Sequence, residues 1–204
     1  MSSESGRSEE LRPNPPCGYG FPVVLSAPSG GGKTTVALSL VKELPFLKLS
    51  RSTTTRPPRG GEQVGREYDY VSDAEFDRIR DAGGFAEWAV VHGHRYGTSA
   101  AFIRDTCAAG DCPLLVIDVE GGKAIKRFDP RTVLVFLMPP SMGELENRLK
   151  ARHTESPDDL NIRLNNAARE IAESAKYDYI ITNEQLDLAV SQVRRVLLRL
   201  RNDR

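Results

Sequence analysis

Segment 27–34 (APSGGGKT) places three glycines directly before a lysine and a hydroxyl side chain, the order of residues in a phosphate-binding loop. An apolar run at 21–27 precedes it and a helical pattern at 33–44 follows, as such a loop requires. Glycines let successive backbone N–H groups point at an anion, and the N-terminus of the helix adds positive potential. Lys33 can then reach the β- and γ-phosphates of a nucleotide, while the Thr34 hydroxyl can coordinate Mg²⁺.

The loop departs from the usual pattern at its first position, where Ala27 replaces a glycine and restricts the backbone. The alternative interpretation of the segment is a glycine-rich turn that only ends a strand. A phosphate loop is shared by GTPases, motor and transport ATPases, and small-molecule kinases. Because the chain is short and has no N-K-x-D signature for reading a base, a compact kinase fits best.

The composition excludes several other classes of protein. Lys plus Arg and Asp plus Glu each number 28 in 204 residues, so the net charge is zero, which disfavours a nucleic-acid coat protein or a membrane-surface binder. With 39% hydrophobic and 27% charged residues, the chain is not mostly disordered. No apolar run approaches the length of a membrane span. The three cysteines lie at no metal-ligand spacing, so we expect a reducing, cytoplasmic location.

The elements that must position the loop are apolar runs alternating with helix-like sequence. The runs lie at 21–27, 114–119, 133–138 and 179–182. Such alternation predicts an α/β fold, with a parallel core sheet between helices in three α/β/α layers, as in P-loop NTPases. Two capping patterns mark helix starts, Ser72 with Glu75 and Ser141 with Glu144, and a stripe of Leu and Val predicts a last helix from residue 186.

The chain divides by composition into a leader, a core and two smaller lobes. Residues 1–20 are rich in Ser, Glu, Pro and Gly and predict a disordered leader. The stretch 51–98 is rich in Thr, Arg, Gly and Tyr, with strand-like pieces at 67–71 and 85–91, and predicts an inserted mixed lobe. A small helical lid is expected at 139–168. The core then comprises 21–50, 99–138 and 169–204.

Ordered motifs in the inserted lobe carry a resemblance to a known family. They are 52–62 (STTTRPPRGGE), the Tyr68-x-Tyr70 pair, 87–89 (EWA), 92–93 (HG) and 96–98 (YGT). Together with the phosphate loop, they resemble guanylate kinase from about Val23 to the C-terminus. The resemblance implies phosphorylation of GMP, and of dGMP, by ATP with Mg²⁺ in purine nucleotide metabolism. It makes the inserted lobe a GMP-binding lobe, with ATP and GMP as partners, and no nucleic acid or membrane is expected.

The chemistry of the lobe agrees with a guanine mononucleotide. Its dianionic phosphate needs cationic or hydroxyl donors, and guanine presents N1–H and N2–H₂ as adjacent donors that one carboxylate can accept. By resemblance, Arg56, Arg59, Tyr68 and Tyr96 hold the phosphate, and Glu87 reads the base with two hydroxyls. The whole implied GMP set is Ser52, Arg56, Arg59, Glu62, Tyr68, Glu87, Tyr96, Thr98 and Asp118.

The resemblance also implies the ATP site and the catalytic groups. Arg152 and Arg163 would close over the transferring phosphoryl group, and the catalytic set is Lys33, Arg152, Arg163 and Asp118. The implied ATP set is Ala27, Pro28, Ser29, Gly30, Gly31, Gly32, Lys33, Thr34, Thr35, Arg148 and Asn183. Thr34 would be the protein ligand of Mg²⁺.

Asp118 has three open interpretations. By resemblance, its carboxylate would lie near Mg²⁺ or would orient an arginine, and the third interpretation is a helix N-cap. The alignment is open as well, because the family usually has two acids here, two residues apart. An ungapped alignment puts Asp118 at the second acid and Val116 at the first, whereas a gapped one uses Asp118 and Glu120.

Two rival functions share part of the pattern. A kinase for a phosphorylated sugar would keep the phosphate loop and lose the base-reading set, which Glu87, Ser52 and Thr98 argue against. A non-enzymatic scaffold domain that binds phosphorylated peptides would lose the ATP-binding features, which the intact Gly32-Lys33-Thr34 argues against. The expected reaction is direct transfer without a covalent intermediate, by alignment and charge neutralisation.

Overall fold

The computed structural model describes most of the chain, namely residues 18–58, 62, 65, 68–91, 93–151 and 157–203. The side chains of 157–159 are not described either. The predicted leader therefore lies almost entirely outside the described residues.

A five-stranded parallel sheet forms the core, in the order β2-β7-β1-β8-β9. Its strands are β1 (Val23–Ser26), β2 (Leu47–Leu49), β7 (Cys112–Val116), β8 (Val133–Met138) and β9 (Tyr179–Thr182). The central strand β1 pairs with β7 on one side and β8 on the other, and all four of its residues are buried. The predicted α/β class is confirmed, because the apolar runs form these parallel strands.

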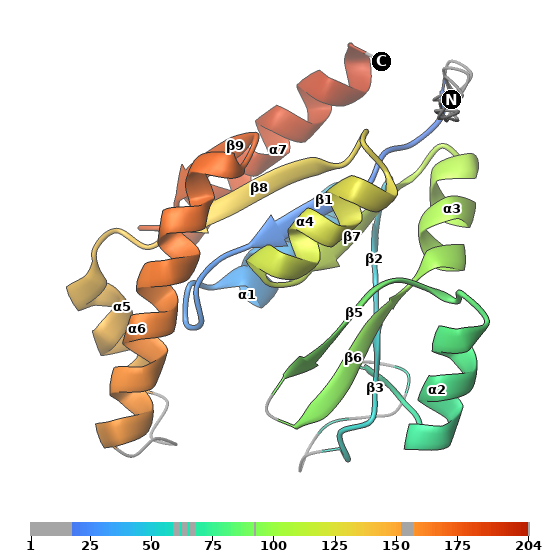
Figure 1. Ribbon diagram of the computed structural model, residues 1–204. Helices are drawn as coiled ribbons and strands as arrows, with labels where there is room; N and C mark the ends of the chain where they lie inside the picture. The colour runs from blue at the N-terminus through green and yellow to red at the C-terminus, as the bar shows by residue number, and fades with distance from the viewer. Residues whose placement is uncertain are drawn as a thin grey trace, which may run out of the picture.

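Helices cover both faces of this sheet (Figure 1). The first face packs α1 (Lys33–Glu43) and α7 (Leu186–Asn202) against one set of alternating strand residues. The second packs α3 (Ala100–Ala108) and α4 (Val119–Phe128) against the other set. Val23 and Val24, neighbours on β1, enter different clusters because successive side chains point to opposite faces of a strand.

The C-terminal end of the strand predicted at 114–119 is wrong. β7 stops at Val116, and α4 begins at Val119 because the Asp118 side chain accepts the Gly121 N–H at 2.8 Å as the N-cap. A carboxylate in this position satisfies one of the N–H groups that a helix start leaves without a partner. The apolar run therefore crosses from a strand into a helix.

A second sheet of four strands comes from the stretch predicted as a mixed lobe, in the order β4-β3-β6-β5. Its strands are β3 (Ser52–Thr54), β4 (Tyr68–Tyr70), β5 (Phe85–Val91) and β6 (His94–Ser99). Helix α2 (Asp73–Asp81) follows β4, and Ser72 caps it through the Glu75 N–H as predicted. Phe76 of α2 packs on Phe85. A Cβ at position 97 on β6 would lie 2.7 Å from the Phe85 ring, so the close approach of this ring requires Gly97.

Helices α5 (Met142–Lys150) and α6 (Pro157–Glu173) and the short 3₁₀ helix η1 (Ser174–Lys176) lie between β8 and β9 in the chain. Ser141 caps α5 through the Glu144 N–H, as the capping pattern predicts. Leu145 and Leu149 are fully buried against α6. In Figure 1 the α5–α6 pair and the four-stranded sheet lie below the core sheet, on opposite sides. Helix α6 is continuous across residue 168, where the lid was expected to end.

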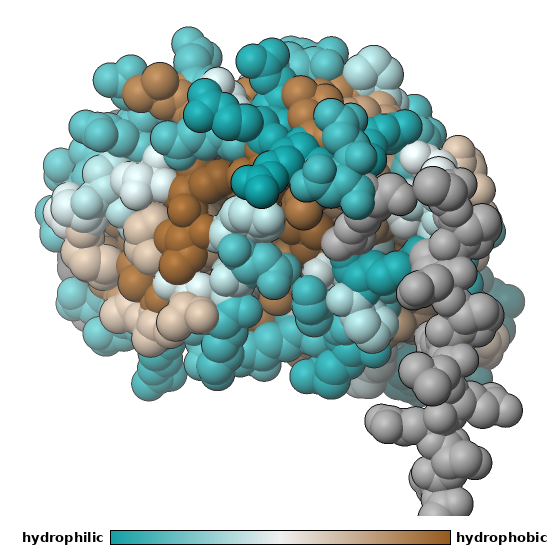
Figure 2. All heavy atoms as spheres, turned by 90° about the horizontal axis from the view of Figure 1, so that it is seen from above, coloured by the Kyte–Doolittle hydropathy of each residue, from teal (hydrophilic) through white to brown (hydrophobic). Residues whose placement is uncertain are grey.

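The face that Figure 2 shows is largely hydrophilic, with apolar side chains in separate patches. Among the described residues, no helix combines the length and the hydropathy needed to cross a bilayer.

Candidate active site

The phosphate loop joins β1 to α1 at the C-terminal edge of the parallel sheet, where open α/β folds bind their ligands. Gly30 and Gly32 have φ values of 83° and 86°, in the left-handed region that favours glycine. A Cβ at Gly31 would lie 2.8 Å from the Cβ of Ala27. The methyl group of Ala27 is therefore accommodated because residue 31 has no side chain.

The start of α1 is open to an anion. Gly32 is its N-cap and provides no side-chain hydrogen bond to the first-turn N–H groups. Such a helix start attracts phosphate through these N–H groups and through the helix dipole. The Lys33 ammonium donates to the Ala27 carbonyl, so it lies over the loop. Thr34 and Thr35 follow in the first turn and are exposed.

Three predicted ATP-site or catalytic residues from distant elements meet at this loop. Asn183 is only 6% exposed, and its Nδ2 donates to the Gly31 carbonyl at 2.9 Å. Arg148 of α5 donates to the backbone carbonyl of Asn183 at 3.1 Å. Arg163 of α6 donates to the Ser29 hydroxyl at 3.4 Å. The Asn183 amide thus helps to shape the loop, in addition to any contact with a nucleotide.

Four predicted GMP-site residues form one row across the four-stranded sheet. Ser52 on β3 pairs with Tyr68 on β4 and with Thr98 on β6, and Thr98 pairs with Glu87 on β5. Residues paired across strands share a face, so all four side chains lie on the same side of the sheet. A register shift between Phe85 and Glu87 brings Glu87 opposite Thr98.

The Glu87 carboxylate is held and partly desolvated. The Thr98 hydroxyl donates to Glu87 Oε1 at 2.5 Å. Burial raises the pKa of Glu87 above its usual 4.5, the Thr98 hydrogen bond lowers it in part, and the nearby Asp118 charge raises it further. An ionised carboxylate under these conditions is stabilised by a ligand that donates hydrogen bonds to it.

The guanidinium of Arg56 is the centre of a second group. It is 7% exposed and donates from Nη2 to both carboxylate oxygens of Glu62 at 2.9 Å. Its Nε donates to the Tyr96 hydroxyl oxygen at 3.2 Å, which leaves the Tyr96 proton to be donated elsewhere. The hydrogen bond to Glu62 is the largest cause that raises the pKa of Arg56. The Arg56 Cζ lies 5.4 Å from the centroid of the Tyr68 ring.

A cleft of about 410 Å³ lies between the phosphate loop and this sheet. It is lined by Lys33, Thr34, Ala37, Leu38, Leu49, Ser50, Arg51, Ser52, Tyr68 and Val116. The Ser50 hydroxyl is buried and has no hydrogen-bond partner among the residues that the structure describes. The structure therefore brings the predicted loop residues Lys33 and Thr34 to the same cleft as Ser52 and Tyr68.

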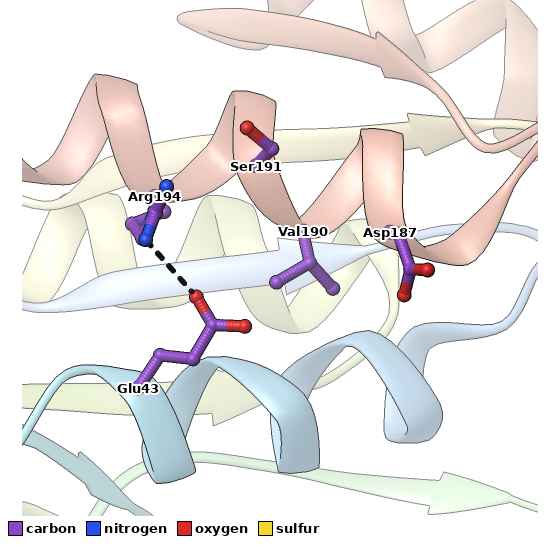
Figure 3. A pocket seen from close by; sticks show the side chains of 5 residues that line it. All are labelled: Glu43, Asp187, Val190, Ser191 and Arg194. Atoms are coloured by element: carbon purple, nitrogen blue, oxygen red, sulfur yellow. Dashed lines mark ion pairs between the residues drawn. The ribbon is translucent and has the colours of Figure 1, made fainter.

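A second hollow, of about 450 Å³, lies between α1 and α7 and is shown in Figure 3. Glu43 and Arg194 form an ion pair across it at 3.5 Å. None of its five lining residues belongs to the predicted sites.

The N-cap interpretation of Asp118 is the one that the structure describes directly. Val116 contributes an apolar side chain to the cleft, while Glu120 is 73% exposed and pairs with Lys123 at 2.7 Å. Arg59 and Arg152 lie outside the described residues, so their predicted roles stay predictions.

Sequence reasoning missed two residues of this region. The Tyr70 hydroxyl donates to Glu62 Oε2 at 2.8 Å, and its spacing from Tyr68 was the available signal. Glu170 on α6 has its pKa raised by burial, with the charge of Lys33 lowering it and that of Asp118 raising it. No pattern in the sequence distinguishes Glu170 from other helical acids.

Comparison with known proteins decides the family. The guanylate kinase family model matches residues 19–200. The chain is 44% identical over 179 residues to the guanylate kinase of Syntrophotalea carbinolica, covering 88% of this chain and 85% of that protein. It is 45% identical over 175 residues to that of Geobacter sulfurreducens, covering 86% of each. The chain belongs to the guanylate kinase family.

Solved structures agree with this assignment. The crystal structure of guanylate kinase from Anaplasma phagocytophilum matches with a TM-score of 0.75 at 33% identity, covering 90% of this chain and 87% of that one. A gluconokinase from Sinorhizobium meliloti matches with a TM-score of 0.50 at 15% identity, which shows a shared fold alone. The resemblance carried by the motifs of the inserted lobe is thereby confirmed.

Proposed function

We propose that this chain transfers the γ-phosphoryl group of Mg²⁺-bound ATP to GMP or dGMP by direct in-line displacement. Phosphorylation of GMP to GDP by ATP is the activity of the family to which it belongs. The observation that carries the finer proposal is the row of Ser52, Thr98 and Glu87 on one face of the four-stranded sheet, with Ser52 at the cleft beside Lys33.

The row supports selection of guanine. Guanine N1–H and N2–H₂ can both donate to one carboxylate, whereas adenine presents no such pair of donors. The Thr98 hydrogen bond fixes the Glu87 carboxylate, so its orientation is set before the base arrives. The proposed contacts go to the base and the phosphate, and dGMP retains both, so we infer that dGMP is also a substrate.

The acceptor phosphate would bind between Arg56 and the tyrosine hydroxyls. The Tyr96 oxygen accepts from Arg56 and can donate its proton to a phosphate oxygen. Arg59 is assigned to the same phosphate by the family motif. Because the attacking group is already an anionic phosphate oxygen, no strong general base is needed.

The donor phosphates would lie on the phosphate loop and the start of α1. Lys33 would exchange its contact with the Ala27 carbonyl for the β- and γ-phosphates. Arg163, already at Ser29, and Arg152 would neutralise charge on the transferring group.

The cleft fits Mg²⁺ held mainly by the phosphates of ATP. Thr34 lines this cleft and is exposed, so its hydroxyl would be the protein ligand of the ion. The described residues contain no cluster of three His, Cys, Asp or Glu that would hold an ion alone. When bound, the ion would supply positive charge that offsets the negative charge of the phosphates.

A coupled assay that measures ADP tests the proposal. The purified chain is offered Mg²⁺ and ATP with GMP, dGMP, AMP or ribose bisphosphate in turn. GMP and dGMP should be phosphorylated, and AMP and ribose bisphosphate should not. Efficient use of AMP or the sugar phosphate would overturn the assignment of the base row. With ATP made chiral at its γ-phosphorus, one in-line step inverts the configuration, and retention would contradict direct transfer.

A further inference from the structure

Tyr70 lies one row away from the base-reading residues on the same face of the small sheet. Thr54 on β3 pairs with Tyr70 on β4 and with Tyr96 on β6. Both tyrosines therefore flank Thr54, and Arg56 follows two residues later, with its backbone N–H donating to the Thr54 hydroxyl at 3.1 Å. Thr54 thus holds the Arg56 backbone, while Tyr96 accepts from the Arg56 guanidinium at 3.2 Å.

The hydrogen bonds of that guanidinium are nearly all committed within the protein. Nη2 donates to both oxygens of Glu62, Nε donates to Tyr96, and Nη1 donates to the Pro57 carbonyl at 2.9 Å. These contacts use four of the five N–H groups of an arginine, so the orientation of Arg56 depends on where Glu62 lies.

Glu62 in turn is held from a second side by Tyr70. The Tyr70 hydroxyl donates to Glu62 Oε2 at 2.8 Å, and the Glu62 side chain is 21% exposed. The ring of Tyr70 lies 5.9 Å from that of Tyr68 in an edge-on arrangement, which fixes the position of the hydroxyl. Burial and the Glu62 hydrogen bond raise the pKa of Tyr70, so its hydroxyl remains a donor.

We propose that Tyr70 is a positioning residue for the acceptor phosphate: its hydroxyl fixes Glu62, and Glu62 fixes Arg56 in the orientation that binds GMP. The inference rests on the proposed function, because it takes Arg56 and Tyr96 as ligands of that phosphate. Tyr70 itself does not contact the reacting atoms in this scheme.

Tyr70→Phe removes the hydroxyl and keeps the ring. A hydrogen bond to a charged group is worth about tenfold or more in an equilibrium. We expect the KM and the calorimetric Kd for GMP to rise roughly fivefold to twentyfold, with the KM for ATP within about twofold of the wild-type value. Tyr179→Phe, which removes a hydroxyl from core strand β9, is the matched control and should change neither KM.

The pair of Tyr70→Phe and Glu62→Gln distinguishes positioning from general support of the fold. If the hydroxyl acts through Glu62, Tyr70→Phe should have less than about a twofold effect in the Glu62→Gln background. Additive losses in the double variant, an equal rise in both KM values, or an unchanged KM for GMP would each overturn the inference. Wild-type protein that neither binds nor phosphorylates GMP would instead refute the proposed function.

Discussion

Glu87→Gln is the substitution that most sharply separates ligand recognition from stability. It preserves the size of a side chain that Thr98 already holds at 2.5 Å. It replaces one of the two acceptor oxygens by an amide that can only donate. Against the adjacent N1–H and N2–H₂ donors of guanine, that amide leaves one donor without an acceptor.

The magnitude follows from these two hydrogen bonds. Each hydrogen bond to a charged group contributes about 1.5–3 kcal/mol, and the variant loses one and makes the other neutral. A net loss of about 2–4 kcal/mol corresponds to a fall in kcat/KM for GMP of roughly 30-fold to 1000-fold.

The free energy of unfolding should not fall together with the activity in this variant. Because burial raises the folded-state pKa of Glu87 above 4.5, the folded protein binds this proton more tightly than the unfolded chain. The ionised carboxylate therefore lowers the free energy of unfolding progressively as the pH rises through its pKa values. At pH 7 the neutral glutamine removes that cost, so the variant should unfold at the same temperature as the wild type or at a higher one.

The assay is initial-rate kinetics with GMP and AMP, together with a thermal melt at pH 7. Glu43→Gln, in the ion pair with Arg194 at the end of α1, is the control and should leave both kcat/KM values unchanged. An unaltered preference for GMP over AMP in Glu87→Gln would refute the reasoning. So would a large drop in melting temperature, which would make Glu87 a structural residue.

Three further results are expected. Lys33→Met should lower kcat by about a hundredfold or more with little change in melting temperature, because it removes charge stabilisation and leaves the helix start intact; near-normal turnover would reject this role. The wild-type KM for GMP, measured across acid pH, should rise as the pH falls toward the raised pKa of Glu87, since the protonated carboxyl accepts less well; a flat profile would contradict this. Gly97→Ala should lower the free energy of unfolding by about 1–3 kcal/mol in a denaturant titration, because the new Cβ would lie 2.7 Å from the Phe85 ring, and an unchanged midpoint would show that the ring moves freely.

The core was predictable because its signals are local. The apolar runs at β1, β8 and β9 lie within a few residues of the observed strands, and the serine caps of α2 and α5 are both present. The run at 114–119 misled because an apolar residue, Val119, opens α4 directly after the capping Asp118. Hydrophobicity alone does not mark where a strand becomes a helix.

The small sheet was less predictable because its pairing is not local. Strands β3 and β4 have three residues each, too few for a clear alternation, and they pair in parallel although 13 residues separate them in the chain. The motifs named Ser52, Glu87 and Thr98, but only the strand register shows that they share a row. The proposed role of Tyr70 was not predictable either. The strand register places Tyr70 beside Thr54, and its hydrogen-bond partner Glu62 lies eight positions earlier in the chain.

The most direct test of the central claim is calorimetric titration of one sample with both nucleotides. GMP and a non-hydrolysable ATP analogue with Mg²⁺ should each saturate at one per chain, and prior saturation with one should leave the site of the other available. Competition between them for a single site, or binding of neither, would contradict an acceptor site on the small sheet that is separate from the phosphate loop.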